Sequence, residues 1–258
     1  SNRGSLLGAV IILFACMGAP AGYVSAIFCK MFHGAGTDRL RTTLMTALVF
    51  PGVVFVIFFT INCFLWGDRS SGAVPFGTLV ALLAFWFCVS LPLVFLGSFV
   101  GFRAAAVEQP VRTNPIPRQV PDQIWYMKSA PSVLMGGVLP FGVVFVELFF
   151  ILSSIWQHRF YYLFGFMFLV LMILLVTCAE ISVVMAYFQL CSEDYHWWWR
   201  SFFTSGASAL YLFLYASYYF LTRVHIAKSA TFISALIFFG YMFVVSYAFM
   251  VITGFVGF

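Results

Sequence analysis

The sequence predicts an all-α protein, a polytopic bundle of about seven transmembrane helices. Hydrophobic residues make up 63% of the chain and charged residues 8%, whereas a soluble domain carries roughly 25% charged residues. The mean hydropathy of +1.03 is too high for any polar surface to cover. Seven segments are also long and apolar enough to cross the roughly 30 Å of hydrocarbon in a bilayer, which takes about 20 helical residues.

Short polar stretches separate these segments, and Trp or Tyr rings mark several of their ends, as expected at a membrane interface. The predicted spans are residues 6–29, 42–66, 74–102, 133–156, 161–190, 201–221 and 229–258. Prolines inside or at the mouths of the spans should kink or interrupt their helices: Pro20, Pro51, Pro75, Pro92 and Pro140. Residues 1–258 therefore form one transmembrane domain, with almost nothing left for a soluble one.

One polar segment, residues 103–131, interrupts the apolar pattern and is called the strap below. Four prolines between residues 107 and 126 hold it extended. Its apolar residues Ile116, Ile124, Trp125 and Tyr126 are unusual in a linker, so we expect an ordered cover packed over the bundle. Eight Lys and Arg residues lie on the strap's side of the membrane and five on the other, which places the strap in the cytosol.

Two carboxylates, Glu147 and Glu180, lie well inside apolar runs. An acidic residue at mid-helix costs roughly 2.5 to 3.5 kcal/mol on insertion scales, so it needs a partner, a proton or an aqueous cavity. One interpretation is a cargo-recognising or proton-sensitive site. The other is a structural hydrogen bond to a neighbour such as Thr177 or to a carbonyl freed by a proline.

Two small-xxx-small patterns, GAPAG at residues 18–22 and GSFVG at 97–101, let helices approach closely. Gly18, Gly22, Gly97 and Gly101 are therefore candidates for helix packing or recognition. They could serve packing inside the bundle, or a groove for another protein's glycine-rich helix.

The turn CSEDYHWWWRSFFTSG, residues 191–206, concentrates polar and aromatic groups. Glu193, Asp194 and His196 are residue types that bind divalent ions, but their spacing matches no standard zinc motif, and the tryptophans favour an interfacial anchor. Together with Arg112 and Arg118 of the strap, these three are candidates for cytosolic interactions. We expect no metal, no cofactor and no catalytic residue, since no histidine pairs with a nucleophile in a catalytic spacing.

Charge excludes one further class of partner. The net charge of +5 is dispersed among the loops and forms no stripe that could follow a phosphate backbone, so nucleic acid is not expected.

Several long phrases resemble one family, the nonaspanins, also called the transmembrane nine superfamily or endomembrane EMP70 proteins. They are GAPAGYVSA (18–26), NCFLWGDRSSGAVPFGT (62–78), EQPVRTNPIPRQVP (108–121), GGVLPFG (136–142) and the 191–206 turn. The resemblance covers essentially the whole chain. It implies a nine-span protein with a large luminal amino-terminal domain, of which this chain is the last seven spans without that domain.

The resemblance also implies a function. Such proteins act as sorting factors or cargo receptors of the Golgi and endosomes, reaching the plasma membrane in some cases, and aid surface delivery of proteins with glycine-rich transmembrane helices. Expected partners are membrane lipids, transmembrane cargo and coat machinery, the last through a tail signal beyond Phe258. The alternative is a proton-coupled or ion transporter using Glu147 and Glu180. A seven-span receptor fits the span count but lacks the usual DRY and NPxxY phrases.

Overall fold

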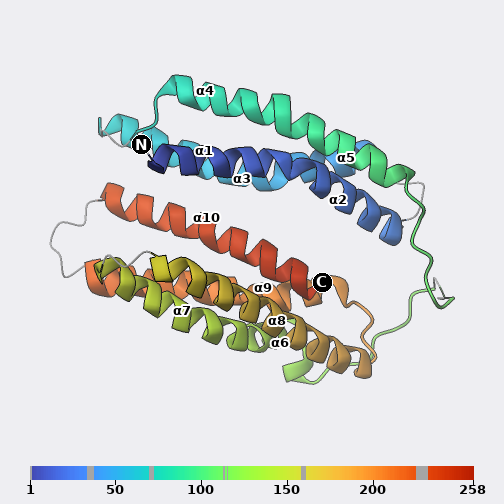
Figure 1. The fold of residues 1–258 in the computed structure, drawn as a ribbon. Coiled ribbons are helices and arrows are strands. Elements are labelled where there is room, and N and C mark those ends of the chain that lie inside the picture. The colour runs from blue at the N-terminus through green and yellow to red at the C-terminus, as the bar shows by residue number, and fades with distance from the viewer. Residues whose placement is uncertain are drawn as a thin grey trace. The chain divides into compact units, whose positions relative to one another are not determined.

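The computed structural model describes residues 2–33, 38–69, 73–112, 114, 116–157, 161–224 and 232–258. Side chains are described at these positions except 2, 3, 33, 147, 148, 150–157, 161–164, 223 and 224. All regular secondary structure in the described ranges is helical, which confirms the predicted all-α fold. The chain divides into two compact units, Ser1–Pro115 and Ile116–Phe258, whose helices are labelled in Figure 1.

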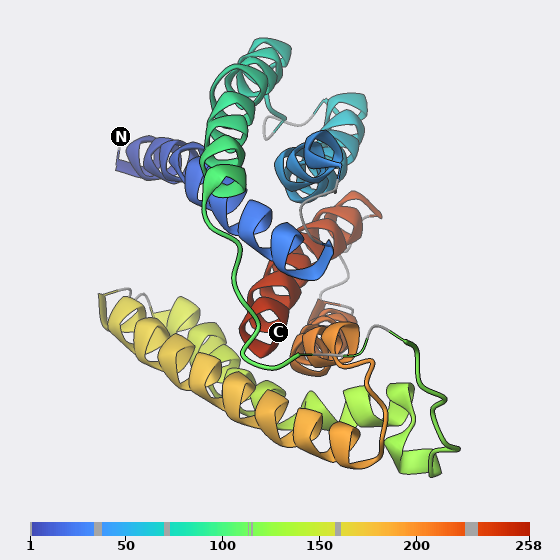
Figure 2. The ribbon, with the colours of Figure 1, turned by 90° about the vertical axis from the view of Figure 1, so that its right-hand side faces the viewer.

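Unit 1 contains helices that pack in pairs. Its elements are α1 (Asn2–Cys16), α2 (Gly18–His33), α3 (Arg39–Gly67), α4 (Phe76–Phe85), the π-helical turn η1 (Trp86–Ser90) and α5 (Leu91–Arg103). The closest pair is α2 and α5, which lie against each other in both views (Figures 1 and 2). The α3 helix contacts both of them.

Unit 2 is organised around one polar helix. Its elements are η2 (Trp125–Met127), α6 (Ser129–Gly136), α7 (Val138–Gln157), α8 (Tyr161–Cys191), α9 (Trp198–Tyr219), η3 (Phe220–Val224) and α10 (Phe232–Gly257). Contacts with α6, α7, α8 and α10 surround α9, and Figure 2 shows α9 beside α10. The buried residues of α9 are mostly small or hydroxylated, from Ser201 to Ala216.

Three helix interruptions come just before a proline. The α2 helix begins two residues before Pro20, α7 begins two residues before Pro140, and η1 ends two residues before Pro92. A proline lacks the N–H that would bond the carbonyl four residues earlier, and its ring clashes with that carbonyl. The predicted single spans 6–29 and 133–156 are therefore each built from two helices.

Pro51 is accommodated differently, because α3 continues through it. The carbonyl four residues earlier belongs to Ala47, and the indole Nε1 of Trp86 donates a hydrogen bond to it over 3.3 Å. The π-helical turn that contains Trp86 thus supplies a donor to the carbonyl that Pro51 leaves free. Neighbouring helices commonly satisfy freed backbone groups in this way in membranes.

The structure bears on six of the seven predicted spans. Six helical segments in the described part of the chain are long and apolar enough to cross a membrane: 4–32, 39–67, 76–103, 129–146, 165–191 and 232–257. The predicted seventh span, 201–221, is the helix α9, which is not among them. Hydroxylated and small residues on its buried face lower its hydropathy, so its crossing of the membrane remains a prediction.

The strap also differs from the expected packed cover. Between Ala104 and Ile124 it has no regular helix. Almost all of the strap's described side chains are exposed, including Ile116 near its middle and Trp125 in η2. Contacts hold it at its two ends, one in each unit, as described below. Its prolines favour an extended backbone without internal hydrogen bonds.

Candidate functional site

The α8–α9 turn ends α8 with a left-handed residue, although the sequence has no glycine at that position. Glu193 adopts a positive φ of 62°, the left-handed region that normally favours glycine. Its N–H bonds the carbonyl of Leu190, and the Asp194 N–H bonds the carbonyl of Gln189. These two bonds define a Schellman motif, which turns the chain sharply and presents the Glu193 and Asp194 side chains beside the strap.

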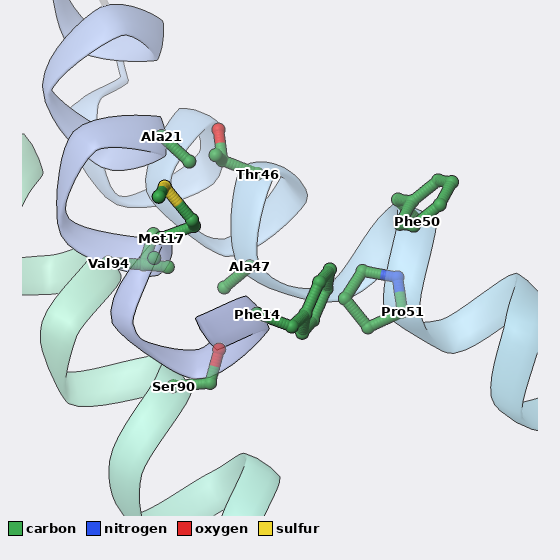
Figure 3. Close-up of a pocket in the computed structure, with 10 residues that line it drawn as sticks. Phe14, Met17, Ala21, Thr46, Ala47, Phe50, Pro51, Ser90 and Val94 are labelled. Carbon is green, nitrogen blue, oxygen red and sulfur yellow. The ribbon is translucent and has the colours of Figure 1, made fainter. Parts of the chain in front are cut away.

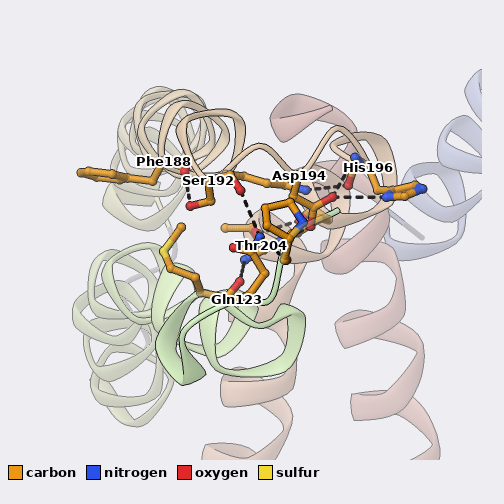
Figure 4. A network of polar contacts seen from close by, with 10 residues as sticks. Gln123, Phe188, Ser192, Asp194, His196 and Thr204 are labelled. Carbon is orange, nitrogen blue, oxygen red and sulfur yellow. Dashed lines mark hydrogen bonds and ion pairs between the residues drawn. The ribbon is translucent and has the colours of Figure 1, made fainter. Parts of the chain in front are cut away.

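Asp194 is the hub of the polar network in Figure 4. Its Oδ1 accepts hydrogen bonds from the His196 backbone N–H at 3.1 Å and lies 3.2 Å from the His196 ring Nδ1. Its Oδ2 lies 3.4 Å from Nη1 of Arg200. One carboxylate thus holds the turn and the first helical residues of α9 together.

Arg200 is the most deeply buried charged group of this network, with only 8% of its surface exposed. Burial lowers the pKa of the Arg200 guanidinium, and the nearby Asp194 carboxylate partly offsets that effect. Its Nη2 donates to the carbonyl of Met127, which belongs to η2 at the end of the strap. Arg200 therefore joins the strap to α9 through a buried, charge-assisted hydrogen bond, a strong kind of contact.

Two further contacts tie the second part of the strap to the turn. The Gln123 side-chain amide donates to the Ser192 carbonyl over 3.0 Å. Arg118 forms an ion pair with Glu193 at 3.9 Å, with 74% and 59% of the two side chains exposed. Such exposed pairs are worth about 0 to 1 kcal/mol, so Gln123 and Arg200 hold this part of the strap more firmly than Arg118 does.

The predicted interaction residues are thus only partly brought together. Arg118, Glu193, Asp194 and His196 meet at the turn, whereas Arg112 lies in the part of the strap that belongs to unit 1. Within the described residues, no three His, Cys, Asp or Glu side chains are grouped to hold a metal ion. With an arginine among its members, the cluster at the turn is suited to fastening structural elements and not to binding a cation.

Substituting Glu193 tests the left-handed turn. We expect Glu193→Gly to match or raise the free energy of unfolding, because glycine removes a cost of about 1 kcal/mol while the exposed pair with Arg118 is lost. Glu193→Val should lower it, because a branched side chain resists positive φ. Melting temperatures of the two variants and the wild type give the order, and a valine variant as stable as the glycine variant would contradict it.

The four small-xxx-small glycines lie at one contact between α2 and α5. A Cβ on Gly22 would lie 2.3 Å from the Val94 carbonyl oxygen, and one on Gly97 would lie 2.0 Å from that of Ala19. Gly18 and Gly101 also face the partner helix, at 3.2 Å from Ser90 O and 2.8 Å from Tyr23 O. This face is occupied by the chain's own helix, so it is not free for a helix of another protein.

A small apolar cleft of about 170 Å³ opens beside that contact. Figure 3 shows Met17 at the α1–α2 break, Pro51 of α3 and Ser90 at the end of η1 around it. Met17 and Ser90 lie where a helix is interrupted, and Pro51 lies inside α3. The small lining residues Gly18, Ala21, Ala47 and Ser90 leave space between the helices unfilled. The cleft is of the order of an engineered cavity that holds a benzene-sized molecule, far smaller than a helix.

The two intramembrane acids are placed unequally. Glu147 lies in α7 but its side chain is outside the described residues. Glu180 lies near the middle of the apolar segment Gly165–Cys191 of α8, with its side chain exposed on the surface of unit 2. Among the described residues nothing hydrogen-bonds to its carboxyl, and the hydroxyl of Thr177 donates instead to the Ile173 carbonyl.

Sequence reasoning missed three residues of structural importance. Gln189 is almost fully buried and donates to the His196 carbonyl over 2.7 Å. Asn62 is equally buried and bonds both backbone groups of Val74, at 2.8 Å and 3.3 Å. Arg200 was interpreted from the sequence as part of an interfacial anchor with the tryptophans of the turn and not as a partner of the strap. The sequence could have indicated Gln189 and Asn62, because each is an amide near the end of an apolar run and a buried amide must find hydrogen-bond partners.

Comparison with known proteins identifies the family. The family model for endomembrane protein 70 matches residues 1–231. The chain belongs to the endomembrane protein 70 family. It is 58% identical over 258 residues to transmembrane 9 superfamily member 8 of Arabidopsis thaliana, covering all of this chain and 39% of that protein. Human members 2 and 4 are each 50% identical, again over the whole chain and 38% and 39% of theirs.

The family assignment confirms the resemblance found in the sequence, and it places this endomembrane protein 70 chain among integral membrane proteins. The chain spans about two fifths of the length of the relatives it matches. No solved structure matches it. The relatives are named as membrane proteins and not as enzymes, and the apolar helices imply contact with lipid.

Proposed function

We propose that this chain is the membrane part of a Golgi and endosomal sorting factor that recognises transmembrane helices of other membrane proteins. The observation that carries the proposal is the exposed Glu180 side chain near the middle of an apolar segment of α8. Family membership supports the endomembrane setting. Cargo identity, delivery to the cell surface and coat binding belong to the proposal.

The surface around Glu180 has the pattern of a helix-docking face. Val176, Val183, Val184 and Tyr187 are exposed on the same helix, and spacings of three, four and seven residues from Glu180 place them on one side. The face is therefore apolar with a single carboxyl at its centre. A partner helix that offered a polar group there would offset the roughly 2.5 to 3.5 kcal/mol that an unpartnered acid costs in the membrane.

A glycine-rich helix fits this face for a geometric reason. Glycine lets two helix backbones approach closely, so the backbone groups of such a helix come within reach of a carboxyl side chain. The small-xxx-small glycines of this chain, Gly18, Gly22, Gly97 and Gly101, are already engaged between α2 and α5, and the exposed face around Glu180 carries no glycine at these spacings, so the glycines for close approach come from the cargo. A polyleucine helix keeps its backbone away and offers the carboxyl no partner.

The transporter alternative is not favoured by the described residues. It needs a polar path leading to the acids, but the buried polar side chains of unit 2 are those around α9, such as Thr204, Ser205 and Ser208, and Glu180 is not among them.

Co-purification tests the proposal. The wild-type chain should capture a single-span reporter with a glycine-rich helix in preference to a polyleucine reporter. Glu180→Leu should reduce that preference by about threefold or more, since interhelical hydrogen bonds in membranes average about 0.6 kcal/mol. Glu180→Gln, which keeps hydrogen-bonding groups, should retain part of it.

The control is Glu108→Gln, which removes a carboxylate from the exposed strap and should leave capture unchanged. A separate Glu147→Gln variant reports on the second intramembrane acid. Equal capture of both reporters by the wild type would refute helix recognition. Unchanged selectivity in Glu180→Leu would remove this face from the mechanism.

A further inference from the structure

We propose that the end of unit 1 from which the strap leaves binds the phosphate of an anionic lipid headgroup. The site, called the basic end below, is made by Lys30, Arg39, Arg41 and Arg103. These residues come from three helices: the last turn of α2, the first turn of α3 and the last residue of α5. The proposal does not depend on the proposed sorting function.

Helix packing brings these cations to one end of the unit. Gly18 of α2 faces Ser90 at the end of η1, Gly22 faces Val94 and Ser98 of α5, and Ala26 faces Gly101. The α2 and α5 helices therefore run in the same direction and finish together. The α3 helix runs the opposite way, because Ser25 contacts Thr46 and Cys29 contacts Thr42. The start of α3 therefore lies beside the ends of α2 and α5.

Side-chain contacts hold three of the four cations in place. The Lys30 Nζ donates to the carbonyls of Phe102, at 3.1 Å, and Ala104, where the carbonyl end of α5 attracts positive charge. The Arg39 guanidinium lies over the Phe102 ring, 5.4 Å from its centroid. The Arg103 guanidinium lies over the Phe99 ring at 4.2 Å.

The arginines of the basic end can donate hydrogen bonds to an anionic ligand. A guanidinium carries five N–H donors in a planar fork that matches the two oxygens of a phosphate. Every ion pair in the described part of the chain involves Asp194 or Glu193 of unit 2, so no carboxylate there neutralises the basic end. Arg39, Arg41 and Arg103 are all exposed.

The charge of unit 1 is concentrated at this end. With Arg112 of the strap, this end carries five cations and two carboxylates, Asp38 and Glu108. The opposite end carries Arg3, Asp68 and Arg69. In unit 2 the residues near the strap pair with one another instead. The basic end thus keeps a surplus of positive charge, which is complementary to an anionic ligand.

Its surroundings identify the ligand as a lipid. Leu40 lies between Arg39 and Arg41, and Phe99 and Val100 lie one helical turn before Arg103. All three are exposed apolar residues at the margin of membrane-length segments. Acyl chains would cover these side chains while the headgroup phosphate meets the guanidinium groups. Cationic residues at such a margin attract anionic lipids, and a soluble phosphate would gain nothing from the apolar surface.

The test measures lipid retained by the protein after release from nanodiscs of phosphatidylcholine containing a minor fraction of phosphatidylserine, read by native mass spectrometry. The wild-type chain should retain phosphatidylserine in preference to phosphatidylcholine. The variant Arg39→Gln, Arg41→Gln, Arg103→Gln should lose that preference by roughly fivefold for each arginine removed. Added inorganic phosphate should not displace the lipid.

The matched control is Arg69→Gln, which removes one positive charge from the opposite end of the same unit and should leave the preference intact. Three results would overturn the proposal. They are an equal loss of the phosphatidylserine preference in Arg69→Gln, an unchanged preference in the triple variant, and displacement of the lipid by inorganic phosphate. Should the triple variant fail to fold, a salt titration of the wild type decides. Binding by exposed cations must weaken as ionic strength rises, and insensitivity to salt would refute it.

Discussion

Replacing Gly97 by alanine should destabilise unit 1 more than the same change at any other described glycine of that unit. The new Cβ would lie 2.0 Å from the carbonyl oxygen of Ala19 and 2.8 Å from its carbonyl carbon. Both are backbone atoms, so no side chain can rotate away and α2 must separate from α5. Overpacking of a core costs about 1 to 3 kcal/mol, and we expect the upper end of that range or more.

Equilibrium unfolding in mixed detergent, compared with the wild type, measures this loss. The matched control is Gly8→Ala in α1, where a Cβ would meet no atom within 4 Å, so stability should be unchanged or slightly raised by the better helix propensity of alanine. If Gly97→Ala proved as stable as Gly8→Ala, the close contact of α2 with α5 would be refuted.

Replacing Arg200 by leucine should release the strap from unit 2 and destabilise that unit. The change leaves the Asp194 carboxylate without its arginine and the Met127 carbonyl without its donor. Removing one partner of a buried ion pair costs about 3 to 5 kcal/mol. Because Asp194 is partly exposed, we expect about 3 kcal/mol, with faster tryptic cleavage after Arg118 and Lys128.

The control for Arg200 is Arg118→Gln, which removes an exposed ion pair worth about 0 to 1 kcal/mol and should barely change the melting temperature. Arg200→Lys should fall between the two, since lysine keeps the charge but lacks the planar fork that serves Asp194 and Met127 together. Trypsin should cleave after Lys128 faster in Arg200→Leu than in Arg118→Gln. Equal rates in the two variants would show that Arg200 does not fasten the strap.

The sequence predicted the helices well because hydrophobicity and proline act locally. Runs of apolar residues gave the membrane segments, and Pro20, Pro92 and Pro140 marked where helices are interrupted. The predicted span 201–221 coincides with most of α9, whose buried residues are mostly small or hydroxylated and pack against other helices. A helix enclosed by protein need not be as apolar as one that lipid surrounds.

The candidate residues were harder to interpret. The pattern of Gly18, Gly22, Gly97 and Gly101 allowed either an internal contact or a recognition groove, because spacing reveals a close approach but not the identity of the partner. The roles of Glu193 and Arg200 depend on a left-handed turn and a buried carbonyl, neither of which leaves a signal in the sequence.

By itself, the sequence determined that this is an all-α integral membrane protein of the endomembrane protein 70 family, because composition, hydropathy and long motifs are properties of the chain alone. Only the tertiary structure decided that the glycines close the α2–α5 contact, that Arg200 fastens the strap and that Glu180 faces outward. Those are matters of which face each helix turns to its neighbours, and that is set by packing between residues far apart in sequence.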